Sequence, residues 1–501
     1  MHKIFVVIIL IIASDVFCSQ DLDSLTNAGL QQAYQFEFQN AEKTFNNVIN
    51  KYPANPAGYF HLSQIYLWYY LGSKDQGDLR VFQKFTDIAL EKTNIYLDKF
   101  GSKPVYLNII GNLYMHKAMV AAVEEKTLDA FWATKKAYGF FEDAIEQDEN
   151  YSSAFLGLGL LEYSLSYVPS MFKWVISLSG LGSDKEKGYR LISKAYKYSF
   201  TQGAKVESSF HLGKIVAEYL GDYSKSVSIL RELVQKYPNN LLFRYQLSLA
   251  LIEKRDLNEA ENNLQFIIKN KQPKFIQTVA YSYFLIGEIY FKRNEFKRAI
   301  EYYQYFLENS TGFDYSGIAY YNTALCYIVL GNTPEAKKNL LLARNGNTDI
   351  ADDIYAAKRS EQIYNQLLNV NQQKILLANN RLQEGNYLEA EKLLATILES
   401  LSGEDKVKSL IILGECALML KKYSLANSLF KQINTNSIKV EEWILPYFYY
   451  LKAELSYQLG KYDIAEDELK KGYSRNSYDF KDKIDAKLNF LSKKLTSKNQ
   501  K

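Results

Sequence analysis

Along most of the chain, apolar residues recur at intervals of three and four, with polar residues between them. This spacing predicts amphipathic helices that each bury one face. Short polar turns interrupt the pattern, for example in LGDYSKS, EGNYLEA and LGKYDIA. Pro53 and Pro238 stand in two KYP sequences and are expected to end helices. The pattern therefore predicts an all-α chain of antiparallel helix pairs.

Small residues mark a repeat within this pattern. Gly29 is followed by Ala41 and Phe45, and Gly287 is followed at the same spacing by Ala299 and Tyr303. Further units carry Ala324, Ala336 and Leu340; Gly414, Ala426 and Phe430; Ala453, Ala465 and Leu469; and, with one extra residue after Gly213, Ser226 and Leu230. Facing small residues let two helices cross closely, and large neighbours fill the grooves beside the crossing. The set resembles the tetratricopeptide repeat (TPR), which implies an α-solenoid with a right-handed superhelix.

One segment, SYVPSMFKWVISLSGLGSDKEKGY at 166–189, departs from the repeats. Its apolar run at 168–181 contains Lys173 and several serines, and it is shorter than the roughly 20 residues of a membrane span. The spacing of a phosphate-binding P-loop is missing from GLGSDKEKG. We expect a buried helix that plugs the groove or joins two half-solenoids. An exposed apolar docking site is the alternative.

The order of features around this segment resembles a second, narrower family. Pro169, an apolar helix, a Gly-Leu-Gly-Ser-Asp turn and Gly188 follow one another within residues 135–265. This arrangement is similar to the eukaryotic inclusion-body-clearance type of TPR protein, although Leu181 and Ser183 depart from its turn. The resemblance implies TPR repeats around an irregular central helical insert. It supplies no functional residues, and the intracellular setting of that family does not match the N-terminus of this chain.

The N-terminus has the layout of a secretory signal peptide. Lys3 precedes an apolar run at 4–13, and small residues follow. Cleavage is expected after Cys18 or after Ser19, which predicts an exported protein of a bacterial periplasm or outer surface. The expected divisions are a signal peptide at 1–18, N-terminal repeats at 19–165, an apolar connector at 166–184, central repeats at 185–345, C-terminal repeats at 346–475, and a polar basic tail at 476–501 that frays at its end.

Composition argues against several functions. The net charge of +4 over 501 residues lacks the strong basic field of a nucleic-acid-binding protein. Cys326 and Cys416 are expected in the core, and the three histidines that follow the predicted signal peptide, His61, His116 and His211, have no metal-ligand spacing. Carboxylates adjacent in sequence, such as Glu441 and Glu442, do not face one another on a helix. Since no catalytic motif is present, we predict no enzyme activity, no cofactor and no metal.

Aromatic residues point instead to binding. The chain has 41 tyrosines and 28 phenylalanines. Counting from the repeat positions places nine residues on or near the concave face: Tyr245, Tyr281, Phe284, Glu288, Tyr321, Tyr447, Tyr450, Glu454 and Tyr457. Such an aromatic groove suits an extended peptide or a helix of a protein partner. We therefore predict a scaffold of a cell-envelope complex that binds a partner segment. A module that binds envelope glycan is the alternative, and self-association stays open.

Overall fold

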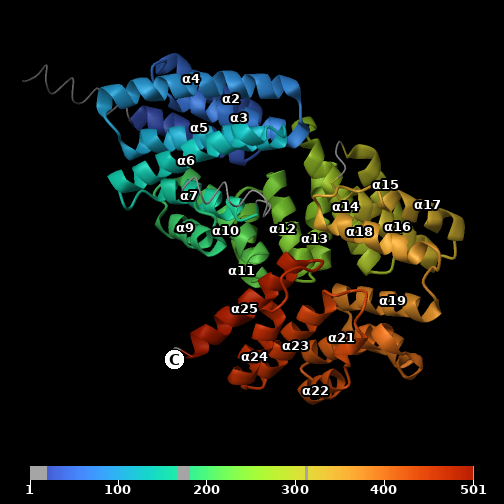
Figure 1. Ribbon diagram of the computed structural model, residues 1–501. Helices are drawn as coiled ribbons and strands as arrows, with labels where there is room; N and C mark the ends of the chain where they lie inside the picture. The colour runs from blue at the N-terminus through green and yellow to red at the C-terminus, as the bar shows by residue number, and fades with distance from the viewer. Residues whose placement is uncertain (1–19, 168–180, 311–313, 500–501) are drawn as a thin grey trace, which may run out of the picture. The chain divides into compact units, whose positions relative to one another are not determined.

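The computed structural model describes residues 20–167, 181–310 and 314–499. Every regular element in these ranges is a helix, as the all-α prediction requires (Figure 1). None of the helices described there combines the length and the hydropathy that crossing a bilayer demands. The predicted signal peptide at 1–18 and residues 168–180 of the apolar connector lie outside the described ranges.

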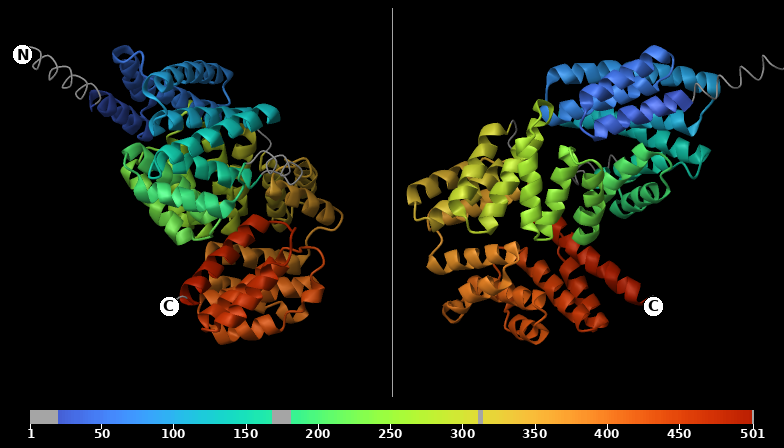
Figure 2. Two further views of the ribbon diagram at one scale, coloured as in Figure 1. Left: turned by 60° about the vertical axis from the view of Figure 1, so that its left-hand side comes forward. Right: turned by 180° about the vertical axis from the view of Figure 1, so that it is seen from behind.

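The chain divides into two compact units. The first comprises residues 1–213, 229–243 and 272–276, and the second comprises 214–228, 244–271 and 277–501. Neighbouring helices within each unit are paired and antiparallel, as Figure 1 and the two views of Figure 2 show. The confirmed fold class is thus a TPR-type solenoid.

The first unit contains helix 20–34 and seven labelled α-helices. Their bounds are Phe38–Lys51 (α2), Ala57–Ser73 (α3), Gln76–Phe100 (α4), Pro104–Val123 (α5), Thr127–Gln147 (α6), Ser152–Leu165 (α7) and Lys185–Tyr198 (α9). Three helices are divided between the units, namely Gln202–Glu218 (α10), Tyr223–Lys236 (α11) and Leu241–Glu253 (α12), and the first residue of a fourth, Ile276, also belongs to the first unit.

The second unit continues with helices in the order of the sequence. They are Leu257–Lys269 (α13), Ile276–Lys292 (α14), Phe296–Asn309 (α15), Ser316–Val329 (α16), Thr333–Ala343 (α17), Ala351–Tyr364 (α18), Val370–Glu384 (α19), Tyr387–Ala395 (α20), Gly403–Met419 (α21), Tyr423–Lys431 (α22), Ile444–Gln458 (α23), Tyr462–Tyr473 (α24) and Lys481–Asn499 (α25). Short 3-10 turns lie at Leu398–Ser400 and Thr435–Ser437 in this unit and at Pro273–Phe275 in the first unit.

Glycine contacts explain the repeat spacing. A Cβ atom added to Gly287 would lie 2.7 Å from Cδ1 of Tyr303, and one added to Gly213 would lie 2.7 Å from Cγ of Leu230. The large residue of the second helix therefore packs directly on the glycine of the first. The small residues of the second helices, among them Ala41, Ala299 and Ala426, are fully buried at the same crossings. Both positions of the predicted pattern are thus packing positions.

Two segments differ from a plain run of repeats. Helix α18 is an additional helix between the pair α16–α17 and the pair α19–α20. Within the tail at 476–501, where we expected fraying, the structure has helix α25 up to Asn499. The reason is an apolar stripe: Ile484, Leu488, Leu491 and Leu495 are buried together with Leu469 of α24. The helix is therefore held by packing despite its many lysines.

Candidate partner-binding site

All nine residues predicted to line a binding groove lie in the second unit, on helices α12, α14, α16 and α23. Seven of them are partly exposed, whereas Phe284 and Tyr321 are only 8% and 6% exposed. The structure thus separates side chains that a partner could reach from side chains that build the interior.

Tyr245 and Tyr281 lie near each other, with Tyr315 as their neighbour. The rings of Tyr281 and Tyr315 have centroids 5.9 Å apart. Burial raises the pKa of Tyr281 to about 12, and Asp314 and Tyr315 add to the shift. Burial also raises the pKa of Tyr245, with smaller contributions from Tyr315 and Tyr281. These hydroxyls therefore stay protonated at neutral pH and can donate hydrogen bonds.

Phe284 and Glu288 face inward. The Phe284 ring packs against the rings of Tyr303 and Phe306 at 6.0 and 5.2 Å. Glu288 accepts a hydrogen bond from the Tyr303 hydroxyl at 2.5 Å and one from Nδ2 of Asn322 at 2.7 Å. Because these donors occupy its carboxylate, Glu288 orients neighbouring helices and offers little to a partner.

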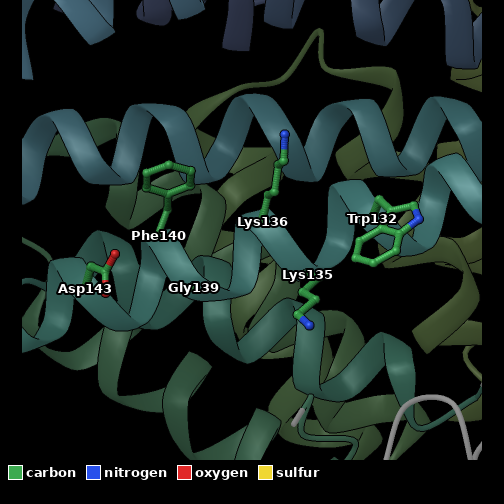
Figure 3. A pocket seen from close by; sticks show the side chains of 6 residues that line it. All are labelled: Trp132, Lys135, Lys136, Gly139, Phe140 and Asp143. Atoms are coloured by element: carbon green, nitrogen blue, oxygen red, sulfur yellow. The ribbon is translucent and has the colours of Figure 1, made fainter. Parts of the chain in front are cut away.

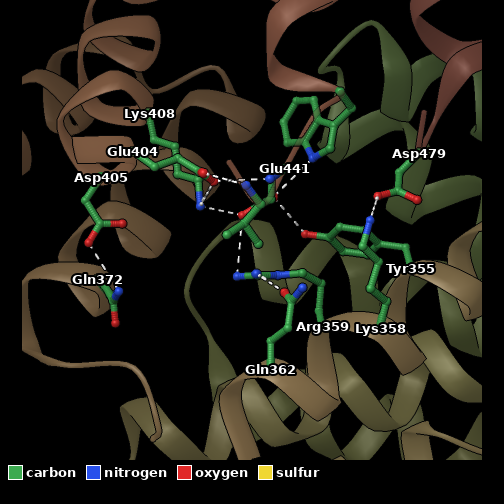
Figure 4. Close-up of polar contacts among 12 residues, drawn as sticks. Tyr355, Lys358, Arg359, Gln362, Gln372, Glu404, Asp405, Lys408, Glu441 and Asp479 are labelled. Carbon is green, nitrogen blue, oxygen red and sulfur yellow. Dashed lines mark hydrogen bonds and ion pairs between the residues drawn. The ribbon is translucent and has the colours of Figure 1, made fainter. Parts of the chain in front are cut away.

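Tyr321 contacts a polar cluster centred on Glu441 (Figure 4). Glu441 accepts hydrogen bonds from the Tyr355 hydroxyl at 3.1 Å and from Nε1 of Trp443 at 3.1 Å. It is also paired with Lys408, and with Arg359 at 3.4 Å. Burial opposes ionisation, but the two cations hold the pKa of Glu441 below its usual value. The cluster joins α18, α21 and the start of α23, which is a structural role.

Tyr447 and Tyr450 stack on each other with ring centroids 5.9 Å apart. The Tyr447 hydroxyl donates to Oε2 of Glu415 at 2.7 Å, and Oε1 of Glu415 pairs with Nη2 of Arg255 at 2.5 Å. The ion pair thus holds the Tyr447 hydroxyl in place through Glu415. On the same helix, Glu454 accepts a hydrogen bond from Gln458 at 2.7 Å.

Tyr457, the last of the nine, lies apart from this cluster. Its ring contacts Tyr462 at the start of α24, with centroids 5.7 Å apart. The nine predicted residues thus form several local groups on the second unit. They do not form one continuous set of contacts.

Helix α25 brings two lysines that the sequence-based prediction missed. Lys483 pairs with Asp352 at 3.0 Å, and the Lys487 ammonium lies 5.1 Å from the centroid of the Tyr223 ring. Burial lowers the pKa of Lys487, and Arg255 and Lys483 lower it further, against the opposing influence of Glu253 and Glu415. The spacing of the two lysines, four residues apart beside the apolar stripe, was the signal that could have revealed them.

These lysines lie among the partly exposed tyrosines. The charge of Lys483 lowers the pKa of Tyr315, and the charge of Arg255 lowers the pKa values of both Lys487 and Tyr450. We call the set the tyrosine surface; it consists of Tyr245, Tyr281, Tyr315, Tyr447, Tyr450, Lys483 and Lys487.

Two histidines and two cysteines that could in principle take part in chemistry are packed among the helices. The His61 ring stacks on Phe45, and burial lowers the pKa values of His61 and His116 to about 4. Cys326 and Cys416 are buried free thiols. No group of three or more potential metal-ligating side chains occurs in the described part of the chain.

Adjacent carboxylates point to different partners, as expected. Asp353 accepts from the backbone amides of Ile318 and Asn347, whereas Asp352 pairs with Lys483. Glu442 pairs with Arg475, away from the cluster that surrounds Glu441.

Comparison with known proteins agrees with this architecture. The family model described as Iml2/Tetratricopeptide repeat protein 39 matches residues 16–359. This match confirms both resemblances and extends the narrower one well beyond residues 135–265. A search of curated proteins finds no match.

Solved structures that resemble the chain have low sequence identity with it. The apo form of RapI covers 78% of the chain and 98% of its own length, with a TM-score of 0.39 and 13% identity. The human IFIT1 dimer covers 82% and 93%, with a TM-score of 0.36 and 13% identity. PilF of Pseudomonas aeruginosa covers 52% and 98%, with a TM-score of 0.34 and 14% identity. These likenesses concern the fold alone.

Proposed function

Because the chain belongs to the Iml2/Tetratricopeptide repeat protein 39 family, we propose that it is a non-enzymatic scaffold that binds a segment of a partner protein across the tyrosine surface. TPR arrays are generally non-catalytic and present extended surfaces for binding. In the second unit, the carboxylates of Glu415, Glu441 and Asp353 take part in ion pairs and hydrogen bonds that hold helices together. This engagement supports a binding role over acid–base chemistry.

One observation carries the proposal: Lys487 is a partly buried cation whose ammonium lies 5.1 Å from the centroid of the Tyr223 ring. Among the described residues, no carboxylate lies within ion-pair distance of its ammonium. The neighbouring cations Arg255 and Lys483 are already paired with Glu415 and Asp352, so the Lys487 ammonium is the group to which we assign an incoming negative charge. We therefore expect the partner segment to present a carboxylate to Lys487 and an apolar or aromatic side chain to Tyr450.

Site-specific photocrosslinking tests this function. A photoreactive amino acid is placed at Tyr281 or at Tyr450 in the full chain, and at Tyr305 as a control. Tyr305 is 41% exposed on α15 and lies outside the tyrosine surface. We expect the same protein adduct at Tyr281 and Tyr450, no such adduct at Tyr305, and its loss when Lys487→Gln is added.

Two results would contradict the proposal. Equal adducts at all three positions would show that the tyrosine surface has no selectivity. Retention of the chain on polysaccharide, removed by Tyr281→Ala but without a protein adduct, would favour the glycan-binding alternative.

We also propose export, with a role in supporting a cell-envelope complex. The support is the order of Lys3, the apolar run at 4–13 and the small residues near Cys18. The family match begins at residue 16, so this run lies outside it. Sequencing the N-terminus of the protein from the native cell tests the proposal. A mature chain beginning at Ser19 or Gln20 is expected, and an intact Met1–Lys3 sequence would contradict export.

A further inference from the structure

A partly buried carboxylate without a counter-ion lies in the first unit: that of Glu207 on helix α10. One of its oxygens, Oε1, accepts hydrogen bonds from the Tyr34 hydroxyl at 3.1 Å and from Nε2 of Gln64 at 2.9 Å. Both donors are neutral. Among the described residues, no lysine, arginine or histidine lies within ion-pair distance of this carboxylate. A charge held partly out of water without a partner is costly, so the site favours a ligand that supplies the opposite charge.

The second oxygen of Glu207 is open. Oε2 accepts no hydrogen bond from the described part of the chain, and it is not sealed from solvent there. Burial raises the pKa of the Glu207 carboxyl, and the hydrogen bonds from Gln64 and Tyr34 offset this effect only in part. A positively charged donor at Oε2 would therefore stabilise the ionised form.

Aromatic rings lie beside the donors that hold Glu207. The centroid of the Tyr34 ring is 6.4 Å from that of Trp68 and 5.7 Å from that of Tyr237. Trp68 follows Gln64 by about one turn of α3 and is partly exposed, whereas Tyr34 and Tyr237 are buried. Of these three rings, the indole is the one that a ligand can reach, and an indole face attracts cations. We call Tyr34, Gln64, Trp68 and Glu207 the Glu207 site.

Charge distinguishes this site from the hollow of about 320 Å³ on the outer face of α6 (Figure 3). That hollow is lined by Lys135 and Lys136 as well as by Asp143. Because both signs of charge occur there, its charge selects no ligand. The Glu207 site presents one carboxylate and no cation, which specifies a positively charged ligand.

The helices that carry the site favour a cation on an extended chain segment. Gln64 and Glu207 are 143 positions apart and lie on α3 and α10, which are the first helices of their pairs. First helices line the concave face of TPR arrays, which offers an extended binding surface. We propose that the Glu207 site binds an arginine or lysine side chain of a partner protein, with the cation at Oε2 of Glu207 and the aliphatic stem along Trp68. This site is independent of the tyrosine surface, which belongs to the second unit.

Trp68 supplies the readout for the test. In the full chain, Trp132, Trp174 and Trp443 are changed to Phe, so that fluorescence reports on Trp68 alone. The probe is a peptide of about nine residues, blocked at both ends, with one arginine at its centre between leucines and glycines. Its twin carries citrulline, which has nearly the same shape without the charge. We expect a saturable change in Trp68 emission and about tenfold tighter binding of the arginine peptide.

Substitutions in the chain test the carboxylate. Glu207→Gln keeps an oxygen that can accept from Tyr34 and Gln64 but removes the charge, so it should weaken binding of the arginine peptide about tenfold and abolish its advantage over the citrulline peptide. The melting temperature should not fall, because no uncompensated charge remains. Glu146→Gln, at an exposed carboxylate of the same unit, and Lys487→Gln, in the tyrosine surface, should leave the affinity unchanged. Misfolding cannot produce retained stability together with the loss of charge selectivity.

Three results would overturn the inference. Equal affinity for the arginine and citrulline peptides, or no saturable signal with either peptide, would show that the site does not select a cation. A preference for arginine that persists in Glu207→Gln would assign the cation to another carboxylate. Binding of free acetylarginine amide that is as tight as binding of the arginine peptide would assign the site to a small cationic compound in place of a partner protein.

Discussion

The ion pair between Arg255 and Glu415 allows a quantitative test of how much a buried contact stabilises the second unit. It joins residues 160 positions apart, from the turn after α12 to helix α21. The side chains are only 14% and 6% exposed. The change we consider is the removal of each charge alone, as Arg255→Met and as Glu415→Leu, and then of both charges together.

The expected magnitude follows from what each variant leaves behind. Arg255→Met leaves a buried carboxylate whose remaining donor is the Tyr447 hydroxyl at 2.7 Å. Glu415→Leu leaves a guanidinium without its carboxylate and Tyr447 without its acceptor. Removing one member of a buried pair costs about 3–5 kcal/mol. The double variant leaves only the Tyr447 hydroxyl without its acceptor, which costs about 1–2 kcal/mol. It should therefore be more stable than either single variant.

Trp443 gives the local readout, because its ring packs 6.2 Å from Tyr447. The three other tryptophans, Trp68, Trp132 and Trp174, are first changed to Phe so that fluorescence reports on this region alone. Guanidinium titration of the four chains then gives the free energies of unfolding. If the double variant loses as much as the two single variants added together, Arg255 and Glu415 are not coupled, and the assignment of a buried ion pair is wrong.

Three further predictions concern both units. Because burial lowers the pKa of His116 to about 4, the folded state favours the neutral ring. The contribution of His116 to stability is expected to fall by about 3 kcal/mol as the pH drops from 6.5 to below 4, so H116F should lose about that much less than the natural chain, in which His61 has the same effect. Gly287→Val should cost about 1–3 kcal/mol in thermal unfolding, since its side chain would meet Tyr303, whereas Gly139→Ala should stabilise by about 0.5–1 kcal/mol. Leu491→Ala, at a fully buried site of α25, should cost about 2–5 kcal/mol and speed amide exchange across 481–499 in mass spectrometry.

The repeat could be predicted because its determinants are local. Gly287, Ala299 and Tyr303 lie within 17 consecutive positions, and their contact depends only on two neighbouring helices. Any chain with this spacing buries the same positions, which is why the fold class followed from the pattern. The concave placement of Tyr245, Tyr281 and Tyr450 used the same counting and stays a prediction for binding.

The spacing of residues along the sequence could not predict the contacts between distant repeats. Whether Phe284 is reachable depends on Tyr303, Phe306 and Tyr315 packing around it, and counting along one helix does not include these neighbours. The pairing of Arg255 with Glu415 has no signature in either helix by itself. Polar residues at such positions look like ordinary solvent-facing residues until the fold places them together.

Helix α25 connects these long-range contacts to function. A repeat array ordinarily gains stability from neighbouring repeats alone, so its ends unfold independently. Here the last helix packs on α23 and α24, and Nδ2 of Asn489 also donates to the backbone carbonyl of Tyr219 at 3.1 Å, 270 positions earlier. The two lysines of the tyrosine surface are therefore in place only while α25 is docked. Release of α25 would remove both cations at once, so the proposal of partner binding at this surface predicts that affinity falls when the C-terminal helix unfolds.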